Sequence, residues 1–190
     1  SCIPNMSIMA PKNLWELRKE LEFAVCHYDG PIAIRYPRGQ AYRGLKEFDA
    51  PIEYGKGEML YEGSRIALLA VGSMVSTAEH VREKLKGAGF TCTLANGRFI
   101  KPVDYGLADR LAKSHGCYGL QVKAYVQEHY PEVQVLTIAL PDAYVEHGNV
   151  SVLRQELGID SDSVIRTMRK TWEPLEDAMK GIIEEKEENK

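Results

Sequence analysis

The arrangement of apolar residues along the chain constrains its fold more than any other feature of the sequence. Short runs with the composition of β-strands alternate with longer segments in which apolar residues recur at helical spacing. The alternation predicts an α/β protein, in which an open sheet carries helices packed on its faces. The predicted strands lie at residues 7–10, 32–36, 58–61, 65–71, 91–95 and 133–138. The predicted helices lie at residues 14–28, 75–85, 104–113, 120–130 and 150–157, with a last one from about 160.

A change of pattern divides the chain into two units. Residues 3–39 form a strand, helix, strand unit, whereas residues 40–52 show no sustained periodicity. We therefore predict that residues 1–42 are the end of one domain, that 43–52 are a linker, and that 53–190 form a second domain. The first predicted strand has no preceding element to pair with, so we expect that the chain begins at the cut edge of a larger protein.

The alternation of strands and helices breaks near Gly116. Two predicted helices, at 104–113 and 120–130, follow one another with no room for a strand between them, and the strand pattern returns only at 133–138. We predict that a strand and a loop are missing near Gly116, either omitted or deleted. Residues 99–102 are expected to form an apolar turn, and the charged tail 173–190 a solvated helix that frays.

Bulk composition points to an ordinary soluble protein of the cytoplasm. The 24 Lys and Arg residues nearly balance the 27 Asp and Glu residues, which gives a net charge of -3 and no feature that would attract nucleic acid or a membrane. The four cysteines are widely spaced, without the pattern of a zinc site, and we expect free thiols in a reducing compartment. The longest apolar run, at 66–71, is too short to cross a bilayer.

Several segments resemble one enzyme family in that family's own order. The string Ile34-Arg35-Tyr36-Pro37-Arg38-Gly39 is similar to the end of the pyrimidine-binding domain of the 1-deoxy-D-xylulose-5-phosphate synthases, which are transketolase-like enzymes that use thiamine diphosphate. The stretch just upstream is similar as well. Resemblance to the family's C-terminal domain lies in Arg98-Phe99-Ile100-Lys101-Pro102-Val103-Asp104, Pro141-Asp142-Ala143-Tyr144-Val145-Glu146-His147-Gly148 and Gly158-Ile159-Asp160.

The resemblance implies a fold and a reaction. It implies a transketolase C-terminal-domain-like open sheet with helices on both faces, preceded by the last strand-helix-strand piece of a pyrimidine-binding domain. The family's enzymes condense pyruvate with glyceraldehyde 3-phosphate and release CO2, in the synthesis of isoprenoid precursors, thiamine and pyridoxal phosphate. They use thiamine diphosphate and Mg²⁺, and a homodimer is expected. The protein positions such a cofactor, which carries the chemistry itself.

The sequence also departs from the family pattern. It has no Gly-Asp-Gly motif for magnesium and diphosphate, no glutamate placed to activate the aminopyrimidine, and none of the family's catalytic histidines. We therefore assign no catalytic, cofactor-binding or metal-binding residue, and expect this stretch alone to be inactive and to bind no cofactor. Two alternatives stay open: a non-catalytic binding or regulatory module, and a subunit of a split 2-oxo-acid dehydrogenase or transketolase-type enzyme.

Arg38 is the residue we assign to substrate binding. It lies just past the carboxyl end of a predicted strand, where open α/β sheets bind ligands, and a guanidinium matches phosphate oxygens in paired hydrogen bonds. In the family that it resembles, the second arginine of this string binds the phosphate of the acceptor substrate. The alternative is a surface arginine in a turn.

Other polar residues are interpreted as structural. Arg35 is expected in mid-strand, paired with a carboxylate, and His147 is expected to support the loop or a domain contact. The pair Gly72-Ser73 could cradle an anion at a helix start, but an N-cap is the simpler reading. No chemistry is assigned to Arg98 or Lys101, because the family uses that region for packing and dimer contact.

Overall fold

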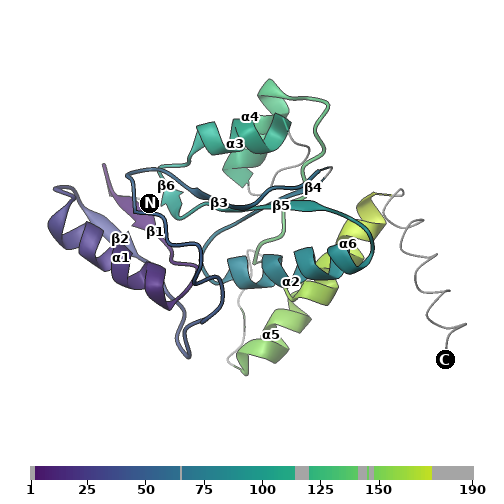
Figure 1. Cartoon of the computed structure of the whole chain (residues 1–190), viewed down its shortest axis with the longest axis horizontal. Coiled ribbons are helices and arrows are strands. Elements are labelled where there is room, and N and C mark those ends of the chain that lie inside the picture. Colours follow the sequence, from purple (N-terminus) through teal and green to yellow (C-terminus); the bar gives the residue numbers. More distant parts are fainter. Residues whose placement is uncertain (1–2, 65, 114–119, 141–144, 146–147, 173–190) are drawn as a thin grey trace, which may run out of the picture.

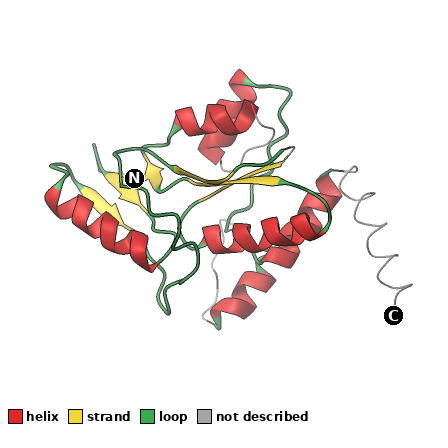
Figure 2. Ribbon diagram, in the orientation of Figure 1, coloured by secondary structure: helices red, strands yellow, loops and turns green. Residues whose placement is uncertain are grey.

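A computed structural model describes residues 3–64, 66–113, 120–140, 145 and 148–172. It contains two three-stranded sheets with helices packed against them (Figure 1). Helices dominate the described chain, and the strands are short (Figure 2). The described residues include no helix that is both long enough and apolar enough to span a membrane.

The N-terminal unit has the strand, helix, strand order that the sequence predicts. Strand β1 (Ser7–Met9) pairs in parallel with β2 (Ile32–Ile34), and helix α1 (Leu14–Cys26) connects them. The side chain of Asn13 caps α1 by accepting a hydrogen bond from the backbone N–H of Glu16. Because β1 and β2 are parallel, their carboxyl ends lie at the same edge of the sheet.

One prediction in this region is wrong: residues 99–102 do not form only a turn. Strand β6 (Phe99–Lys101) pairs antiparallel with β1 and completes the order β2-β1-β6. The buried ring of Phe99 packs against Met9 and Phe23, which stabilises the pairing. The two paired strands are about 90 residues apart along the chain, so local sequence patterns could not show the contact.

The second sheet forms the centre of the remaining chain. Its order is β3 (Glu58–Tyr61), β5 (Cys92–Asn96), β4 (Ile66–Ala70), with β4 parallel and β3 antiparallel to β5. Helices α2 (Met74–Gly87) and α6 (Ser161–Thr171) cover one face, and α3 (Tyr105–Lys113) and α4 (Leu120–His129) cover the other (Figure 1). This arrangement confirms the predicted sheet with helices on both faces. The short helix α5 (Val150–Glu156) precedes α6.

Residues 133–138 do not form the predicted strand. They keep the alternation of one, since Val133 and Val135 pack against the cluster that includes α3 and α4, whereas Leu136 and Ile138 pack against the cluster that includes α2 and α6. Among the residues that the structure describes, they have no neighbouring strand to pair with. The sequence pattern therefore identified the faces correctly but not the backbone pairing.

Between β2 and β3 the chain has neither helix nor strand, as expected for residues 40–52. Leu45 in this stretch is nevertheless buried, against Leu60, Val75 and Leu94. The sequence around Gly116, most of the loop 141–148 and the tail from residue 173 lie outside the described residues. The domain boundaries at residues 42 and 53 stay predictions.

Candidate functional site

Arg38 lies beyond the carboxyl end of β2 and is exposed. Backbone pairing continues one residue past the strand, because the N–H of Arg35 donates to the carbonyl of Met9 at 2.8 Å. Gly39 follows with a φ of 127°, a conformation that favours glycine and turns the chain. Within the described residues, Arg38 makes no ion pair and no side-chain hydrogen bond. Its five donors therefore face solvent at the edge where parallel strands end.

The prediction for Arg35 is wrong in both respects. Strand β2 ends at Ile34, so Arg35 lies after the strand, and its side chain is exposed. None of the carboxylates in the described ranges pairs with it. Two arginines, at positions 35 and 38, thus follow the same strand end and leave local positive charge there.

The start of α1 lies near this edge, and two of its backbone donors already have protein partners. The N–H of Leu14 donates to the carbonyl of Tyr42 at 3.1 Å, and the N–H of Glu16 donates to the Asn13 side chain at 2.9 Å. The Asn13 amide in turn donates to the carbonyls of Gly44 and Leu45. The helix start therefore anchors residues 42–45 through donors that an anion would otherwise use.

A buried ionic cluster lies next to this anchor and joins the two units. The Lys12 ammonium contacts Glu16 at 2.9 Å and Glu58 at 2.7 Å, and the Arg98 guanidinium contacts the same two carboxylates at 2.9 Å and 3.0 Å. All four side chains are at most 7% exposed. Two cations and two anions thus balance one another away from water, as buried charges require.

Neutral groups complete the hydrogen bonding of this cluster. The amide of Asn96 donates to both oxygens of Glu16 at 2.9 Å. Arg98 also donates to the carbonyls of Ala50 and Pro51, so it holds the connection between the units. Burial by itself would raise the pKa of Glu16, but the nearby Lys12 and Arg98 outweigh it and hold that pKa below its usual value. Glu16 is therefore a stable carboxylate at neutral pH.

One acidic side chain beside this cluster is left without a partner. Glu20, one turn after Glu16 on α1, has no exposed surface, and neither of its carboxyl oxygens makes a hydrogen bond. Burial, with the negative charge of Glu16, raises the pKa of Glu20 to about 9. Glu20 is therefore protonated at neutral pH, which avoids an uncompensated buried charge.

The remaining sequence-based assignments have mixed outcomes. Ser73 takes the N-cap position of α2, but its side chain makes no capping hydrogen bond. Gly72 has a φ of 61°, and a Cβ added at this residue would lie 3.0 Å from the Cβ of Ala10. The turn and this close contact explain the glycine without an anion site. His147 lies outside the described residues.

Sequence reasoning missed the ionic cluster. Lys12 and Glu16 have the spacing of an ion pair on one helix turn, but such pairs usually lie at the surface. Glu58 is 46 residues from Lys12, and Arg98 is 82 residues from Glu16. Only the tertiary fold brings these charges together. The one hint of the cluster in the sequence is Arg98, an arginine next to a predicted strand. The resemblance assigns its region only to packing or dimer contact.

The described residues bring together no ligand set for the metal that the sequence resemblance implies. Across the described ranges, no three His, Cys, Asp or Glu side chains come together as a possible metal site. The ionic cluster is internally neutral and filled by its own partners, so it offers no ligand set to a diphosphate-bound magnesium ion. The arrangement at Arg38 suits a different task, the binding of a small anion from solvent.

Comparison with known proteins identifies relatives over most of the chain. A 1-deoxy-D-xylulose-5-phosphate synthase of Lachnoclostridium phytofermentans is 42% identical over 178 positions, which cover 87% of this chain and 28% of the relative. One from Chlorobium phaeovibrioides is 38% identical over 181 positions, covering 88% and 28%. This chain therefore spans less than a third of the length of these curated relatives.

The first alignment also shows an internal difference in length. It runs over 178 positions, although 87% of 190 residues is only about 165 residues of this chain. The relative therefore has roughly a dozen residues within the aligned region that find no counterpart here. The second alignment gives a difference of the same size.

Solved structures and a family model agree on the fold. A split-gene transketolase described as an inactive beta4 tetramer superposes with a TM-score of 0.77 at 21% identity, over 89% of this chain and 58% of its own. The transketolase of Campylobacter jejuni gives 0.67 at 20% identity, over 88% and 26%. The model of the transketolase C-terminal domain matches residues 55–164. The chain therefore belongs to the transketolase C-terminal domain family, and it is similar over most of its length to 1-deoxy-D-xylulose-5-phosphate synthases.

Proposed function

We propose that this chain is the C-terminal part of a 1-deoxy-D-xylulose-5-phosphate synthase. The complete enzyme would condense pyruvate with glyceraldehyde 3-phosphate and release CO2, as a thiamine-diphosphate-dependent transferase. The observation that carries the proposal is the 42% identity to such a synthase over most of this chain. The same proposal includes a cytoplasmic homodimer, the use of Mg²⁺, and domain boundaries at residues 42 and 53.

Within that enzyme, Arg38 would bind the phosphate group of glyceraldehyde 3-phosphate. Three observations support this role: the exposed position of Arg38, the lack of a competing carboxylate among the described residues, and the location past two parallel strand ends. A guanidinium can donate two parallel hydrogen bonds to a phosphate. Arg35 would add positive charge at the same edge of the sheet and need not contact the phosphate itself.

The buried ionic cluster would act as the rigid base for this edge. Lys12 lies three residues after the end of β1, and the cluster ties it to Glu58 and Arg98 of the second unit. Arg98 also holds the backbone at Ala50 and Pro51. These contacts fix the chain on both sides of Arg38. We assign the cluster a positioning role and no contact with substrate.

In the complete enzyme, Arg38→Ala is expected to raise KM for glyceraldehyde 3-phosphate by about 10- to 100-fold. The reason is that a hydrogen bond to a charged group contributes about 1.5 to 3 kcal/mol. KM for pyruvate should change less than about 2-fold, because pyruvate has no phosphate. Steady-state kinetics with each substrate varied in turn measure both values.

Arg18→Ala provides the matched control, since Arg18 is also exposed but lies on α1. It should leave both KM values unchanged. Equal small changes in both constants for Arg38→Ala would contradict the proposed role.

Assays of CO2 release with and without glyceraldehyde 3-phosphate test the wider function. Release that needs a lipoyl partner protein instead of this aldehyde would favour a 2-oxo-acid dehydrogenase subunit.

A further inference from the structure

The segment that carries Arg38 is held at its two ends and not along its length. At its start, the N–H of Arg35 donates to the carbonyl of Met9 at 2.8 Å. Residues 36–41 are exposed, and within the described part of the chain they make no hydrogen bond. The next backbone bond is at Tyr42, whose carbonyl accepts from the start of α1. The orientation of Arg38 therefore depends on how firmly these two ends are fixed.

The side chain of Tyr42 ties the far end of this segment to the second unit. Its hydroxyl donates a hydrogen bond to the carboxylate of Glu79 on α2. The half-buried ring packs against the apolar cluster around Leu45 and Leu60. The backbone and the side chain of Tyr42 thus bind different units, since its carbonyl contacts the start of α1 and its hydroxyl contacts α2.

The surroundings of this hydrogen bond make it a strong contact. Its acceptor is a carboxylate, and hydrogen bonds to charged groups are stronger than those between neutral groups. Burial, together with the hydrogen bond to Glu79, raises the pKa of the Tyr42 hydroxyl above its ordinary value. The hydroxyl therefore keeps its proton at neutral pH and remains the donor.

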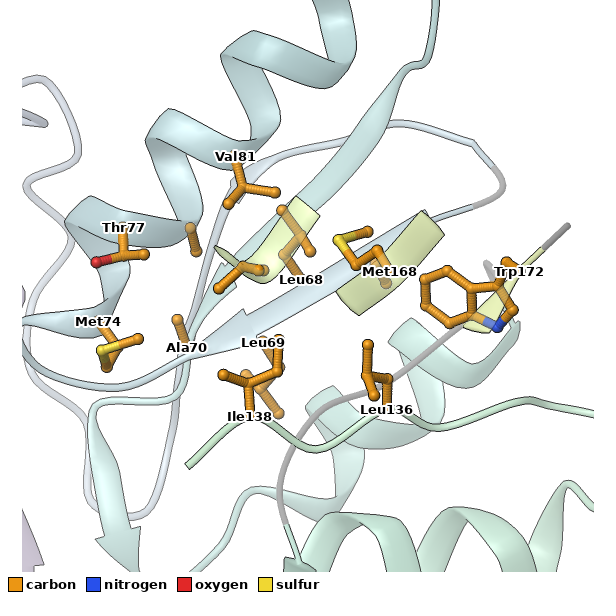
Figure 3. A pocket seen from close by; sticks show the side chains of 13 residues that line it. Leu68, Leu69, Ala70, Met74, Thr77, Val81, Leu136, Ile138, Met168 and Trp172 are labelled. Atoms are coloured by element: carbon orange, nitrogen blue, oxygen red, sulfur yellow. The ribbon is translucent and has the colours of Figure 1, made fainter. Parts of the chain in front are cut away.

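Helix α2 provides a rigid attachment point for this contact. Figure 3 shows the apolar space between α2, β4 and α6, which Met74, Thr77 and Val81 line from the side of α2. Met74 packs against a buried cluster that includes β4, and Val81 belongs to one that also includes α6. The helix that carries Glu79 is therefore fixed to the second sheet and to α6 by its own apolar face.

We propose that Tyr42 is a positioning residue for the phosphate site at Arg38. The latch, by which we mean the hydrogen bond from Tyr42 to Glu79, fixes the far end of the 36–41 segment to the second unit. Arg38 then meets the phosphate group from a segment that is already ordered. A ligand that must first order its binding segment loses affinity, so the latch strengthens phosphate binding without touching the substrate. This inference rests on the proposed function, and its tests separate the two.

In the complete enzyme, Tyr42→Phe is expected to raise KM for glyceraldehyde 3-phosphate by about 3- to 10-fold. The substitution keeps the ring and removes only the hydroxyl that forms the latch. KM for pyruvate should change less than about 2-fold, because pyruvate has no phosphate. The same limit applies to kcat, because a loss of binding that is equal in the ground state and the transition state leaves kcat unchanged. Steady-state kinetics with each substrate varied in turn measure all three constants.

Two further comparisons isolate the latch. Tyr61→Phe is the matched control: it removes a hydroxyl beside the same apolar cluster, where it faces the exposed Glu47 at 3.5 Å, and should leave the three constants unchanged. Glu79→Ala removes the acceptor and should match Tyr42→Phe. Glu79→Gln removes the same charge but keeps an acceptor oxygen, so its KM for glyceraldehyde 3-phosphate should stay within about 2-fold of that of the unsubstituted enzyme.

A double variant tests whether Tyr42 acts through Arg38. Arg38→Ala combined with Tyr42→Phe should have the same KM for glyceraldehyde 3-phosphate as Arg38→Ala alone, within about 2-fold, because no phosphate ligand is left to position. A further increase of about 3- to 10-fold in the double variant would show a general structural role and overturn the proposal. An unchanged KM in Tyr42→Phe, when Arg38→Ala raises it, would overturn the proposal as well.

Hydrogen exchange tests the latch without any substrate. The N–H of Leu14 donates to the carbonyl of Tyr42 at 3.1 Å, so its exchange reports the mobility of that end of the segment. In Tyr42→Phe it should exchange at least about 3-fold faster, whereas the N–H of Arg35, bound to Met9 at the other end, should keep its rate. Unchanged KM in Arg38→Ala with faster exchange at Leu14 would overturn the phosphate site and not the latch. Equal exchange at Leu14 in both proteins would overturn the latch itself.

Discussion

Replacement of Arg98 by methionine is expected to destabilise the fold by about 3 to 5 kcal/mol. Methionine keeps much of the apolar length of the side chain, but it removes the charge that balances Glu16 and Glu58. Lys12 would then face two buried carboxylates alone, and the carbonyls of Ala50 and Pro51 would lose their donor. Urea-induced unfolding, followed by circular dichroism, measures the loss.

The chain offers a matched control for this substitution. Arg110 also faces a glutamate, Glu62, at 4.0 Å, but both side chains are more than 60% exposed. Arg110→Met should therefore change the free energy of unfolding by less than about 1 kcal/mol. In the double variant Arg98→Met with Glu58→Gln, part of the lost stability should return, because one excess charge is gone. If Arg98→Met cost no more than Arg110→Met, the cluster would not hold the units together.

Replacement of Glu20 by methionine is expected to stabilise the protein increasingly as pH rises. The folded state raises the pKa of Glu20 to about 9 from an ordinary value of 4.5, so between these values the folded chain holds a proton that the unfolded chain has lost. This group therefore stabilises the fold fully below pH 4.5, and its contribution falls by about 1.4 kcal/mol for each pH unit up to about 9.

The test compares the free energy of unfolding at pH 6 and at pH 8. Between these values the unsubstituted chain should lose about 3 kcal/mol more than Glu20→Met, in which the proton linkage is absent. The control is Glu22→Met, an exposed glutamate on the same helix, which should retain the pH dependence of the unsubstituted chain. Parallel stability curves for Glu20→Met and the unsubstituted chain would show that Glu20 is ionised or solvated in the fold.

The periodicity of the sequence predicted the helices and most strands because each element buries one side of a local pattern. The apolar run of β4 is an example, and it formed as predicted. Helix α1 also formed, but the apolar stripe expected on it is not its buried face: the helix buries Glu16, Glu20 and Phe23, whereas Leu21 and Val25 are exposed. Strand β6 was missed because its three residues gain their stability from β1, far away in the sequence. The prediction for residues 133–138 failed for the opposite reason: their pattern is that of a strand, but no described residue pairs with the backbone of 134–138.

The candidate site was predictable only in part. The position of Arg38 after a strand follows from local sequence, and the structure places it at the expected edge of the sheet. Its role as a phosphate ligand stays a prediction. The cluster of Lys12, Glu16, Glu58 and Arg98 could not be inferred from the sequence. A charged residue is expected to be exposed to solvent, and only the fold shows that three other charged side chains surround it.

Because β6 pairs with β1, the two units are held together by contacts that do not depend on the peptide chain between them. Residues 99–101 belong to the second unit by sequence, but they complete the sheet of the first. A protease that cuts the backbone in the exposed stretch around residues 46–47 would sever the connection without releasing a fragment, because strand pairing and the Lys12–Glu58 contact both span the cut. The nicked protein would migrate as one particle in a native gel and as two bands after denaturation.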